Sequence, residues 1–478
     1  MKRYRTLFFV GIMVSLLIAF TRFDRSMVTQ KMSASNSDIE FWTTTGDKTF
    51  LFSRAGELTF GNETGNHPVI EIDTTRRFQT MDGFGFSLTG GSAYLLNRKL
   101  NADQRNTLLK ELFLTDKNNI GISYLRISIG SSDLDDHVFT YNDLPRGKTD
   151  TPLAKFSLSP DQRDLIPVLR QILVLSPGLK IMGSPWSAPA WMKTNHNLKG
   201  GSLKPEYYGA YADYFVKYVQ GMAREGIFID AITVQNEPEN PGNNPSMVMT
   251  ANEQTKFVKN NLGPALRAAG LTTKIVVFDH NCDHPEYPLA ILSDPIAKKY
   301  IDGSAFHLYL GEIEVLSQVH NAHTDRNVYF TEQWTSPQGT FEGDLRWHTR
   351  NLIIGAARNW SRNVLEWNLA ADPQYNPHTG EGGCTECLGA LTIGDTVTRN
   401  VSYYIIAQAS KFVRPGSVRV ASNVIGNLHN VAFLTLENKK VLIVLNDSEE
   451  NNFFTIKCGD KKVTTSLRGG AVGTFIWR

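Results

Sequence analysis

From about Met81 onward, short apolar segments alternate with loops and longer amphipathic stretches. Eight of these segments have the length and composition of buried strands; they lie near residues 81–88, 122–129, 179–184, 229–235, 274–279, 303–309, 327–332 and 363–368. Strands that alternate with helical segments indicate βαβ units and a parallel sheet. Eight such units close a barrel, so the pattern predicts an α/β fold, a (β/α)8 TIM barrel over residues 76–413.

Capping signals support helices between these strands. Asn101 is followed by Gln104 and Thr250 by Glu253, which is the spacing of a capping box. Residues 159–162, which begin Ser-Pro and end with Gln, predict a third helix start. Gly270 follows an alanine-rich run and predicts a helix end.

Both ends of the chain differ from the barrel region. Residues 38–75 alternate apolar and polar side chains, as in Thr49–Ser53 and Val69–Asp73, which is typical of half-buried strands. Further strands are predicted in residues 414–478, at 418–420, 431–436, 441–445, 453–456 and 473–477. We therefore expect one β-sandwich side domain formed by N- and C-terminal strands.

The first residues have the pattern of a secretory signal. Lys2, Arg3 and Arg5 precede the uncharged apolar stretch Leu7–Phe20, which is shorter than the ~20 residues that span a bilayer. Residues 1–26 are predicted as a signal peptide without a clear cleavage motif, and an uncleaved anchor is the alternative. We expect an exported protein: periplasmic, cell-surface or secreted. The net charge of +2 argues against a nucleic-acid partner. The sequence shows no obvious basic amphipathic helix that could dock on a lipid surface, so no stable membrane partner is expected.

Two glutamates end predicted strands. Glu237 lies in the sequence Gln-Asn-Glu-Pro, and Glu332 in Phe-Thr-Glu-Gln-Trp. Their separation corresponds to about three strand–helix units of roughly 30 residues each. Carboxylates at the carboxyl ends of barrel strands face the active-site side, and a pair of them is the equipment for cleaving a glycosidic bond. The alternative is that each pairs with a lysine or arginine as a structural strand-end residue.

Together with these two motifs, residues 78–85, 183–193 and 366–369 resemble glycoside hydrolase family 30, the family of glucosylceramidase and endo-β-1,6-glucanase. The resemblance runs from about residue 50 to the C-terminus. It implies that Glu237 is the general acid/base and Glu332 the nucleophile of a retaining hydrolase. It also implies that Asn236 bonds the sugar 2-hydroxyl and that Arg126 keeps the nucleophile ionised. Asp133 resembles the carboxylate that binds outer sugar hydroxyls, with a loop-capping role as its alternative.

Aromatic residues extend the resemblance. Trp186 and Trp367 resemble the walls on which a sugar ring stacks, although core tryptophans are the alternative. Tyr309 resembles the tyrosine that bonds the nucleophile. His307 alternates with Tyr309 on one predicted strand and is expected to bind substrate, with a structural histidine as its alternative.

Four cysteines and two histidines invite other interpretations. In an oxidising compartment Cys384 and Cys387 form a possible disulfide; half of a zinc site is the alternative. Residues 280–284, His-Asn-Cys-Asp-His, suggest either a metal site or a substrate-lining loop. A glutamate-pair hydrolase requires neither metal nor cofactor, so none is expected.

These observations favour a retaining hydrolase that acts on a β-glucan or β-glucoside. The loops at 279–288 and 382–389 resemble the microbial glucanase branch, so an endo-β-1,6-glucanase is the preferred activity. The alternatives are a glucosylceramidase-type β-glucosidase and a xylan- or fucoside-directed enzyme. Two other classes are a metal-dependent hydrolase and a non-catalytic carbohydrate-binding protein; the intact glutamate pair argues against the latter.

Overall fold

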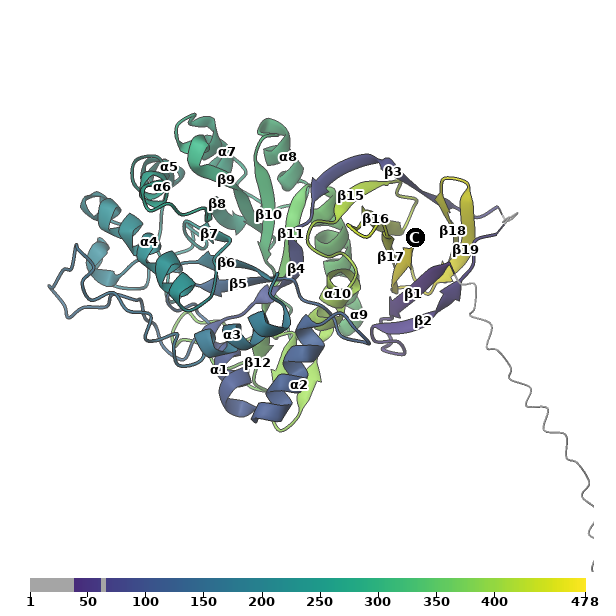
Figure 1. Ribbon diagram of the computed structural model, residues 1–478, viewed down its shortest axis with the longest axis horizontal. Helices are drawn as coiled ribbons and strands as arrows, with labels where there is room; N and C mark the ends of the chain where they lie inside the picture. Colours follow the sequence, from purple (N-terminus) through teal and green to yellow (C-terminus); the bar gives the residue numbers. More distant parts are fainter. Residues whose placement is uncertain (1–37, 62–65) are drawn as a thin grey trace, which may run out of the picture. The chain divides into compact units, whose positions relative to one another are not determined.

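The computed structural model describes residues 38–61 and 66–478. The predicted signal peptide, residues 1–26, lies outside the described residues. Within the described part, no helix combines the length and apolar character needed to cross a membrane. The described chain forms a closed eight-stranded barrel, a nine-stranded sheet and a small sheet of three strands (Figure 1).

All eight predicted barrel strands are present and run parallel in the order of the sequence, so the predicted barrel is confirmed. Their ends differ from the predicted ends by at most two residues, and the fourth strand is only three residues long. The barrel strands are β4 (Gly83–Ser87), β5 (Tyr124–Ser128), β6 (Lys180–Ser184), β7 (Ala231–Thr233), β8 (Lys274–Asn281), β9 (Ile301–His307), β10 (Asn327–Glu332) and β11 (Ser361–Asn368).

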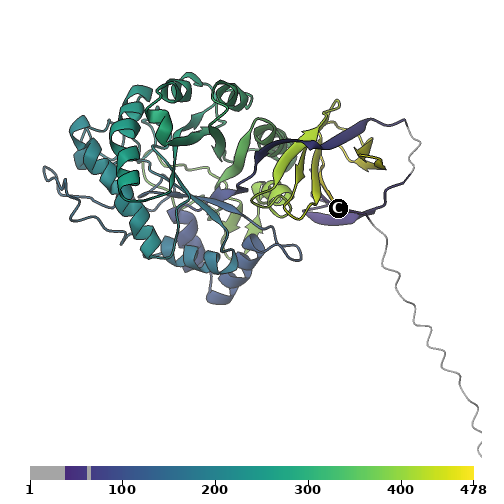
Figure 2. The ribbon, with the colours of Figure 1, turned by 45° about the horizontal axis from the view of Figure 1, so that its top comes forward.

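Helices follow the barrel strands and surround them (Figure 2). Two begin with the predicted capping boxes, at Asn101 and at Thr250, and Gly270 follows a helix end with φ of 66°. The helices are α1 (Gly90–Tyr94), α2 (Ala102–Phe113), α3 (Leu165–Leu175), α4 (Tyr208–Arg224), α5 (Ala251–Phe257), α6 (Gly263–Ala268), α7 (Glu286–Ser293), α8 (Val315–Ala322), α9 (Phe341–His348) and α10 (Val401–Ser410).

The predicted helix start at residues 159–162 is wrong. This stretch forms turns, and α3 begins only at Leu165. The Asp161 carboxylate accepts a hydrogen bond from the Tyr141 hydroxyl at 2.5 Å, and its carbonyl accepts one from the Ile166 amide. These contacts anchor the turn, and the helix starts where the apolar run begins.

The nine-stranded sheet joins both ends of the chain, which confirms the predicted sandwich. Its strands follow the order β19-β18-β3-β15-β16-β17-β20-β1-β2, and their inward side chains form a separate apolar core. Strand β1 pairs with β20, and β3 pairs with β15 and β18. The strands are β1 (Ile39–Thr44), β2 (Ser53–Leu58), β3 (Val69–Thr80), β15 (Val418–Ser422), β16 (Leu428–Leu434), β17 (Lys440–Asn446), β18 (Asn452–Cys458), β19 (Lys461–Leu467) and β20 (Val472–Trp477).

One predicted N-terminal strand is wrong. Residues 49–52 belong to the connection between β1 and β2, and Phe52 has φ of 47°. Its ring packs against Trp42, with ring centroids 4.8 Å apart. The apolar residues there anchor a turn in the core and do not form a ladder.

An apolar layer inside the barrel supports the site above it. Seven barrel strands each contribute one residue to this layer: Tyr124, Met182, Ala231, Val276, Ala305, Tyr329 and Leu365. Side chains two positions apart on a strand point to the same side. The next inward side chains toward the carboxyl ends are therefore Arg126, Ser184, Thr233, His307, Thr331 and Trp367, and polar groups lie directly above the apolar layer.

Candidate active site

Bulges in two barrel strands turn carboxylates into this polar layer. In β8 the pairing register shifts between Phe278 and His280, and Phe278 and Asp279 both have positive φ, 72° and 68°. The Phe278 ring consequently packs outside the barrel, 5.0 Å from the Tyr287 ring, while Asp279 points inward. In β10 a similar shift precedes Glu332. Bulges of this kind re-aim side chains near active sites.

Glu332 ends β10 and accepts two strong hydrogen bonds. Arg126 Nη1 donates to Oε2 at 2.6 Å, and the Tyr309 hydroxyl donates to Oε1 at 2.9 Å. Burial raises the pKa of Glu332 above its ordinary value, although His307 and Arg126 oppose that rise. Because an arginine does not release its proton, one positive charge beside Glu332 is permanent.

Arg126, on β5, is fully buried and organises the floor of the site. Its Nη2 donates to Asn236 Oδ1 at 2.6 Å and to Asp279 Oδ2 at 2.7 Å, and its Nε donates to Ser184 Oγ. The bond to Asn236 fixes the orientation of that amide.

Glu237 follows β7 and has φ of 45°, a conformation that residues other than glycine rarely adopt. Its backbone N–H donates to the Asp279 carbonyl at 3.0 Å, which helps to hold it there. His307 Nδ1 lies 3.1 Å from Oε1. The side-chain amides of Asn240 and Asn243 donate to Oε2 at 2.8 and 3.0 Å.

His307 ends β9 and lies between two carboxylates. Its Nε2 is 3.2 Å from Asp279 Oδ1, opposite the contact with Glu237. Burial disfavours its charge, but Glu332, Asp279 and Glu237 outweigh burial and raise the pKa of His307 to about 9. Burial would likewise raise the pKa of Glu237, but His307 outweighs it and lowers that pKa to about 2. At neutral pH the Glu237–His307 pair therefore holds one proton, and it resides on the imidazole.

Asp279 completes the network, although sequence reasoning did not single it out. Burial opposes its ionisation, but Arg126 and His307 hold its pKa well below the usual range. Thr331 Oγ1 also donates to Asp279 Oδ1 at 2.7 Å. The available signal was the same as for the glutamates, an acidic residue at the end of an apolar strand.

The two glutamates lie close together. Glu237, His307 and Glu332 each offer one possible ligand atom, and these atoms lie within 4.8 Å of one another. No other group of three potential metal-ligating residues is found in the described part of the chain, so residues 280–284 do not form one. The permanent charge of Arg126, 2.6 Å from Glu332, disfavours a cation in the glutamate group.

Asp133 lies in the loop after β5 and is buried. Burial, together with the nearby charges of Glu332 and Glu237, raises the pKa of Asp133 to about 8. Asp133 therefore lies near the two glutamates. A carboxyl that is largely protonated can both donate to and accept from sugar hydroxyls.

Three tryptophans line the region beside Arg126. Trp186 and Trp367 have ring centroids 5.5 Å apart, and the Arg126 guanidinium lies 4.8 Å from the Trp186 ring. Their exposed fractions are only 2% and 3%, so little of either face is free. Trp334 packs beside them and is half-buried, so it offers a more accessible face than either predicted wall. Cys384 and Cys387 are disulfide-bonded and pack against this cluster.

Two family models match the chain. The model of the glycosyl hydrolase family 30 TIM-barrel domain matches residues 81–413, which is more than half of the sequence. The model of the family's β-sandwich domain matches residues 416–475. The chain belongs to glycosyl hydrolase family 30. It is therefore a glycoside hydrolase, and the resemblance seen in the sequence is confirmed.

Relatives within glycosyl hydrolase family 30 include enzymes with two activities. An endo-1,6-β-D-glucanase of Neurospora crassa is 38% identical over 364 residues, 73% of this chain and 74% of the relative. One of Aspergillus fumigatus is 34% identical and covers 84% of this chain and 86% of the relative. Lysosomal acid glucosylceramidase of Mus musculus is 28% identical, covering 89% and 87%. A solved endo-β1,6-glucanase has a TM-score of 0.86 at 34% identity, covering 92% of this chain and 99% of that one.

Loops beside Glu237 contain further polar residues. Glu239 lies 2.8 Å from His284 Nδ1, which joins the loop after β7 to the loop after β8. Lys193 is buried, and its ammonium group donates to Ser187 Oγ and to the carbonyls of Leu198 and Ser246. Burial lowers the pKa of Lys193 to about 7. Lys193, Asn240 and Asn243 were not recognised from the sequence, because their contacts depend on how the loops fold.

Trp191 is a structural residue. Its Nε1 donates to the carbonyl and the side-chain oxygen of Asn142, at 3.1 and 2.9 Å. The ring is buried and lies edge-on to Tyr207.

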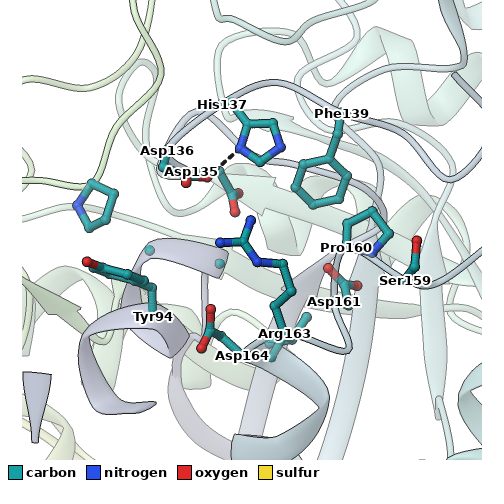
Figure 3. A pocket seen from close by; sticks show the side chains of 14 residues that line it. Tyr94, Asp135, Asp136, His137, Phe139, Ser159, Pro160, Asp161, Arg163 and Asp164 are labelled. Carbon is teal, nitrogen blue, oxygen red and sulfur yellow. Dashed lines mark hydrogen bonds and ion pairs between the residues drawn. The ribbon is translucent and has the colours of Figure 1, made fainter. Parts of the chain in front are cut away.

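A second cavity of about 280 Å3 lies at the same rim of the barrel, between α1, the loop after β5 and the start of α3. Figure 3 shows the Arg163 side chain extending toward Asp135, with His137, Phe139 and Tyr94 around it. Burial raises the pKa of Asp135 to about 7 and that of Asp161 to about 8. Neither Glu237 nor Glu332 lines this cavity, so it is distinct from the candidate active site.

Proposed function

We propose that this glycoside hydrolase is an exported endo-β-1,6-glucanase that retains the anomeric configuration, with Glu332 as nucleophile and Glu237 as acid/base. The observation that carries the proposal is the arrangement of the two carboxylates and their different partners. Residues 76–413 would form the catalytic barrel, and residues 38–75 and 414–478 the sandwich. The basic and apolar N-terminal segment supports export, to the periplasm, the cell surface or the medium.

The separation of the carboxylates supports retention. Retaining enzymes place the two carboxyl groups roughly 5–5.5 Å apart, whereas inverting enzymes leave roughly 6.5–9.5 Å for a water molecule. Oxygen atoms of Glu237 and Glu332 lie within 4.8 Å of each other. That distance fits the spacing of a retaining pair better than the spacing of an inverting pair.

Formation of the covalent intermediate follows from the contacts of Glu332. One Glu332 oxygen attacks the anomeric carbon, and the bond from that carbon to the glycosidic oxygen breaks. The leaving oxygen takes the proton of Glu237. Arg126 and Tyr309 hold the attacking carboxylate in place, and the free amide hydrogens of Asn236 are placed to bond the 2-hydroxyl, a contact that strengthens in the transition state.

Hydrolysis of the intermediate reverses these roles. Glu237, now ionised, takes a proton from a water molecule, whose oxygen attacks the anomeric carbon and releases Glu332. Because both displacements occur at the same carbon, the β configuration is restored. His307 can supply the proton that Glu237 needs in the first step and recover it afterwards, since its Nδ1 lies 3.1 Å away.

The substrate is proposed from the relatives and from the rim of the site. The relatives with the higher identity bear the name endo-1,6-β-D-glucanase, and the mouse glucosylceramidase is less similar. The loop beside Glu237 presents Glu239, Asn240 and Asn243, and His284 faces it. Such a polar rim suits a sugar leaving group better than the lipid of glucosylceramide, which favours apolar surface.

A panel of substrates tests the proposal. The protein is incubated with β-1,6-, β-1,3- and β-1,4-glucans and with glucosylceramide, and products are separated by chromatography. We expect oligosaccharides of several lengths from the β-1,6-glucan and the highest kcat/KM on that polymer. A preference for glucosylceramide would replace the proposed substrate. Release of glucose alone from the chain end would contradict endo action.

A further inference from the structure

Two side-chain amides donate hydrogen bonds to the oxygen of Glu237 that does not contact His307. Asn240 Nδ2 and Asn243 Nδ2 donate to Oε2 at 2.8 and 3.0 Å, and both residues belong to the loop after β7. Oε2 has two lone pairs, so both are taken by N–H donors. The acid/base therefore has three donors around it, counting His307 at Oε1.

This arrangement stabilises the anion of Glu237 and opposes its role as an acid. Hydrogen bonds donated to a carboxylate favour the ionised form. A proton cannot occupy Oε2 while two N–H groups point at it. Before Glu237 protonates a leaving oxygen from that side, at least one amide must find another acceptor.

We propose that Asn240 and Asn243 form the leaving-group subsite and that the departing sugar draws their amides away from Glu237. The hydroxyls of that sugar replace Oε2 as acceptors. Glu237 then gains the proton of His307 Nδ1 at Oε1, and rotation of the released carboxyl presents that proton to the glycosidic oxygen as the glycosidic bond breaks. Occupation of this subsite thus converts Glu237 from a stabilised base to an acid. The inference rests on the proposed glycosidase mechanism but not on the linkage that is cleaved.

The surrounding charges fit such a conversion. The groups near Glu237 are His307, His280, Glu332, Asp279, Arg126, Asp133 and Glu239. Arg126 is fixed by Glu332 and Asp279, whereas the two amides carry no charge and can turn without leaving an ion unpaired. The asparagines are therefore the donors that can move away from Glu237 at the lowest cost.

Asn243 is the better residue to change. The Asn240 side chain also accepts a hydrogen bond from the Gly242 amide and so shapes the loop. Within the described residues, the only side-chain hydrogen bond of Asn243 is the one to Glu237. Asn243→Ala removes the amide, and Asn243→Leu keeps a similar size but supplies neither a donor nor a charge. Asn244→Ala, one position along the same loop, is the matched control.

The test compares two substrates that both require acid assistance. One is the oligosaccharide that the wild type cleaves best, and the other is an unactivated phenyl β-glycoside, whose leaving group carries no sugar hydroxyls. We expect Asn243→Ala and Asn243→Leu to lower kcat/KM on the oligosaccharide roughly 5- to 15-fold, the loss of about one hydrogen bond. On the phenyl glycoside kcat/KM should be retained, with the basic limb of its pH profile moved to higher pH.

Other results would overturn the inference. An equal loss on both substrates in a folded variant would mean that Asn243 only supports the loop. An unmoved basic limb on the phenyl glycoside would mean that the amide does not control the protonation of Glu237. Wild-type behaviour on both substrates would exclude a contact with the leaving group. If the wild type prefers a linkage other than β-1,6, the proposed substrate is wrong. The comparison of the Asn243 variants with the wild type still tests this inference, because it uses whichever oligosaccharide the wild type cleaves best.

Discussion

Glu237 and Glu332 are the same residue type in one cavity, and their partners distinguish them. Glu332 is held by Arg126, which keeps its proton under all working conditions. Glu237 is held by His307, which can release a proton, and by two neutral amides. A carboxylate with a permanent cation suits a nucleophile, and one with a proton-carrying neighbour suits an acid/base.

The first prediction separates these roles. In Glu237→Ala, substrates with poor leaving groups should stall, whereas an activated aryl β-glucoside should still form the intermediate because its leaving group needs little protonation. Added azide should then restore turnover and give a β-glycosyl azide. Glu332→Gln, as comparison, should lose several orders of magnitude on both substrates, without rescue. An α-azide would contradict retention with Glu237 as acid/base.

The second prediction concerns pH. The raised pKa of His307, about 9, keeps a proton beside Glu237, so the wild type should lose activity on the basic side only as that proton leaves. In His307→Gln, Glu237 itself must carry the proton, and the pKa of a glutamate is lower than the value of about 9 that His307 has in the wild type. The basic limb of kcat/KM should therefore move at least about one pH unit downward. A basic limb that stays in place would show that His307 does not hold the catalytic proton.

At the scale of strands and loops, the register of each barrel strand determines which of its side chains point into the site. A regular strand would place Phe278 in the cavity, and the bulge in β8 places Asp279 there. Phe278 then joins the core outside the barrel. The short strand β7 ends at Thr233, so Asn236 and Glu237 lie on the loop beyond it.

The register of the strands explains which features could be predicted from the sequence and which could not. Short apolar runs revealed every barrel strand, and carboxylates at their ends marked Glu237 and Glu332. Strand β19, Lys461–Leu467, was missed because it lies at the sheet edge and carries mostly polar residues. Asp279 carried the same strand-end signal as the glutamates, but its inward direction required knowledge of the bulge, and Asn243 required knowledge of how a loop folds back on Glu237. Neither leaves a periodic signal in the sequence.

The third prediction concerns the loop that holds the disulfide. Replacing Cys384 and Cys387 by alanine opens a very short loop, which should lower the free energy of unfolding by about 2 kcal/mol at most. Because the disulfide packs against Trp186 and Trp367, the larger effect should be on substrate binding, with KM raised on the order of threefold. Cys458→Ser, on β18, is the control and should leave KM unchanged. A lower stability without a change in KM would contradict this role.

For the whole molecule, α10 connects the barrel to the sandwich. The buried Gln408 donates to Thr44 Oγ1 at 2.8 Å and accepts from Thr474 Oγ1 at 2.6 Å. Thr44 ends β1, and Thr474 lies in β20. The described residues, from Asp38 onward, also belong to one compact unit. The two parts therefore share buried contacts and should not unfold separately.

The fourth prediction follows from these contacts. Calorimetry of the wild type should show one unfolding transition, with loss of activity at the same temperature. Gln408→Ala should remove two buried hydrogen bonds and lower the free energy of unfolding by roughly 1–3 kcal/mol, since Thr44 Oγ1 still accepts from the Phe52 amide and Thr474 Oγ1 still donates to the carbonyl of residue 408. Gln318→Ala, on the exposed face of α8, should have little effect. Two separate transitions in the wild type would contradict the coupling.

The position of β20 between β17 and β1 has a consequence for synthesis. The Thr43 hydroxyl bonds the carbonyl of Val472, across 429 residues. A ribosome adds roughly 5–20 residues per second, so β1 is made tens of seconds before its partner exists. During that interval the strand has an unpaired edge, which other chains can pair with. Nascent chains should therefore be most prone to aggregate late in elongation, when the barrel is complete and only β20 is missing.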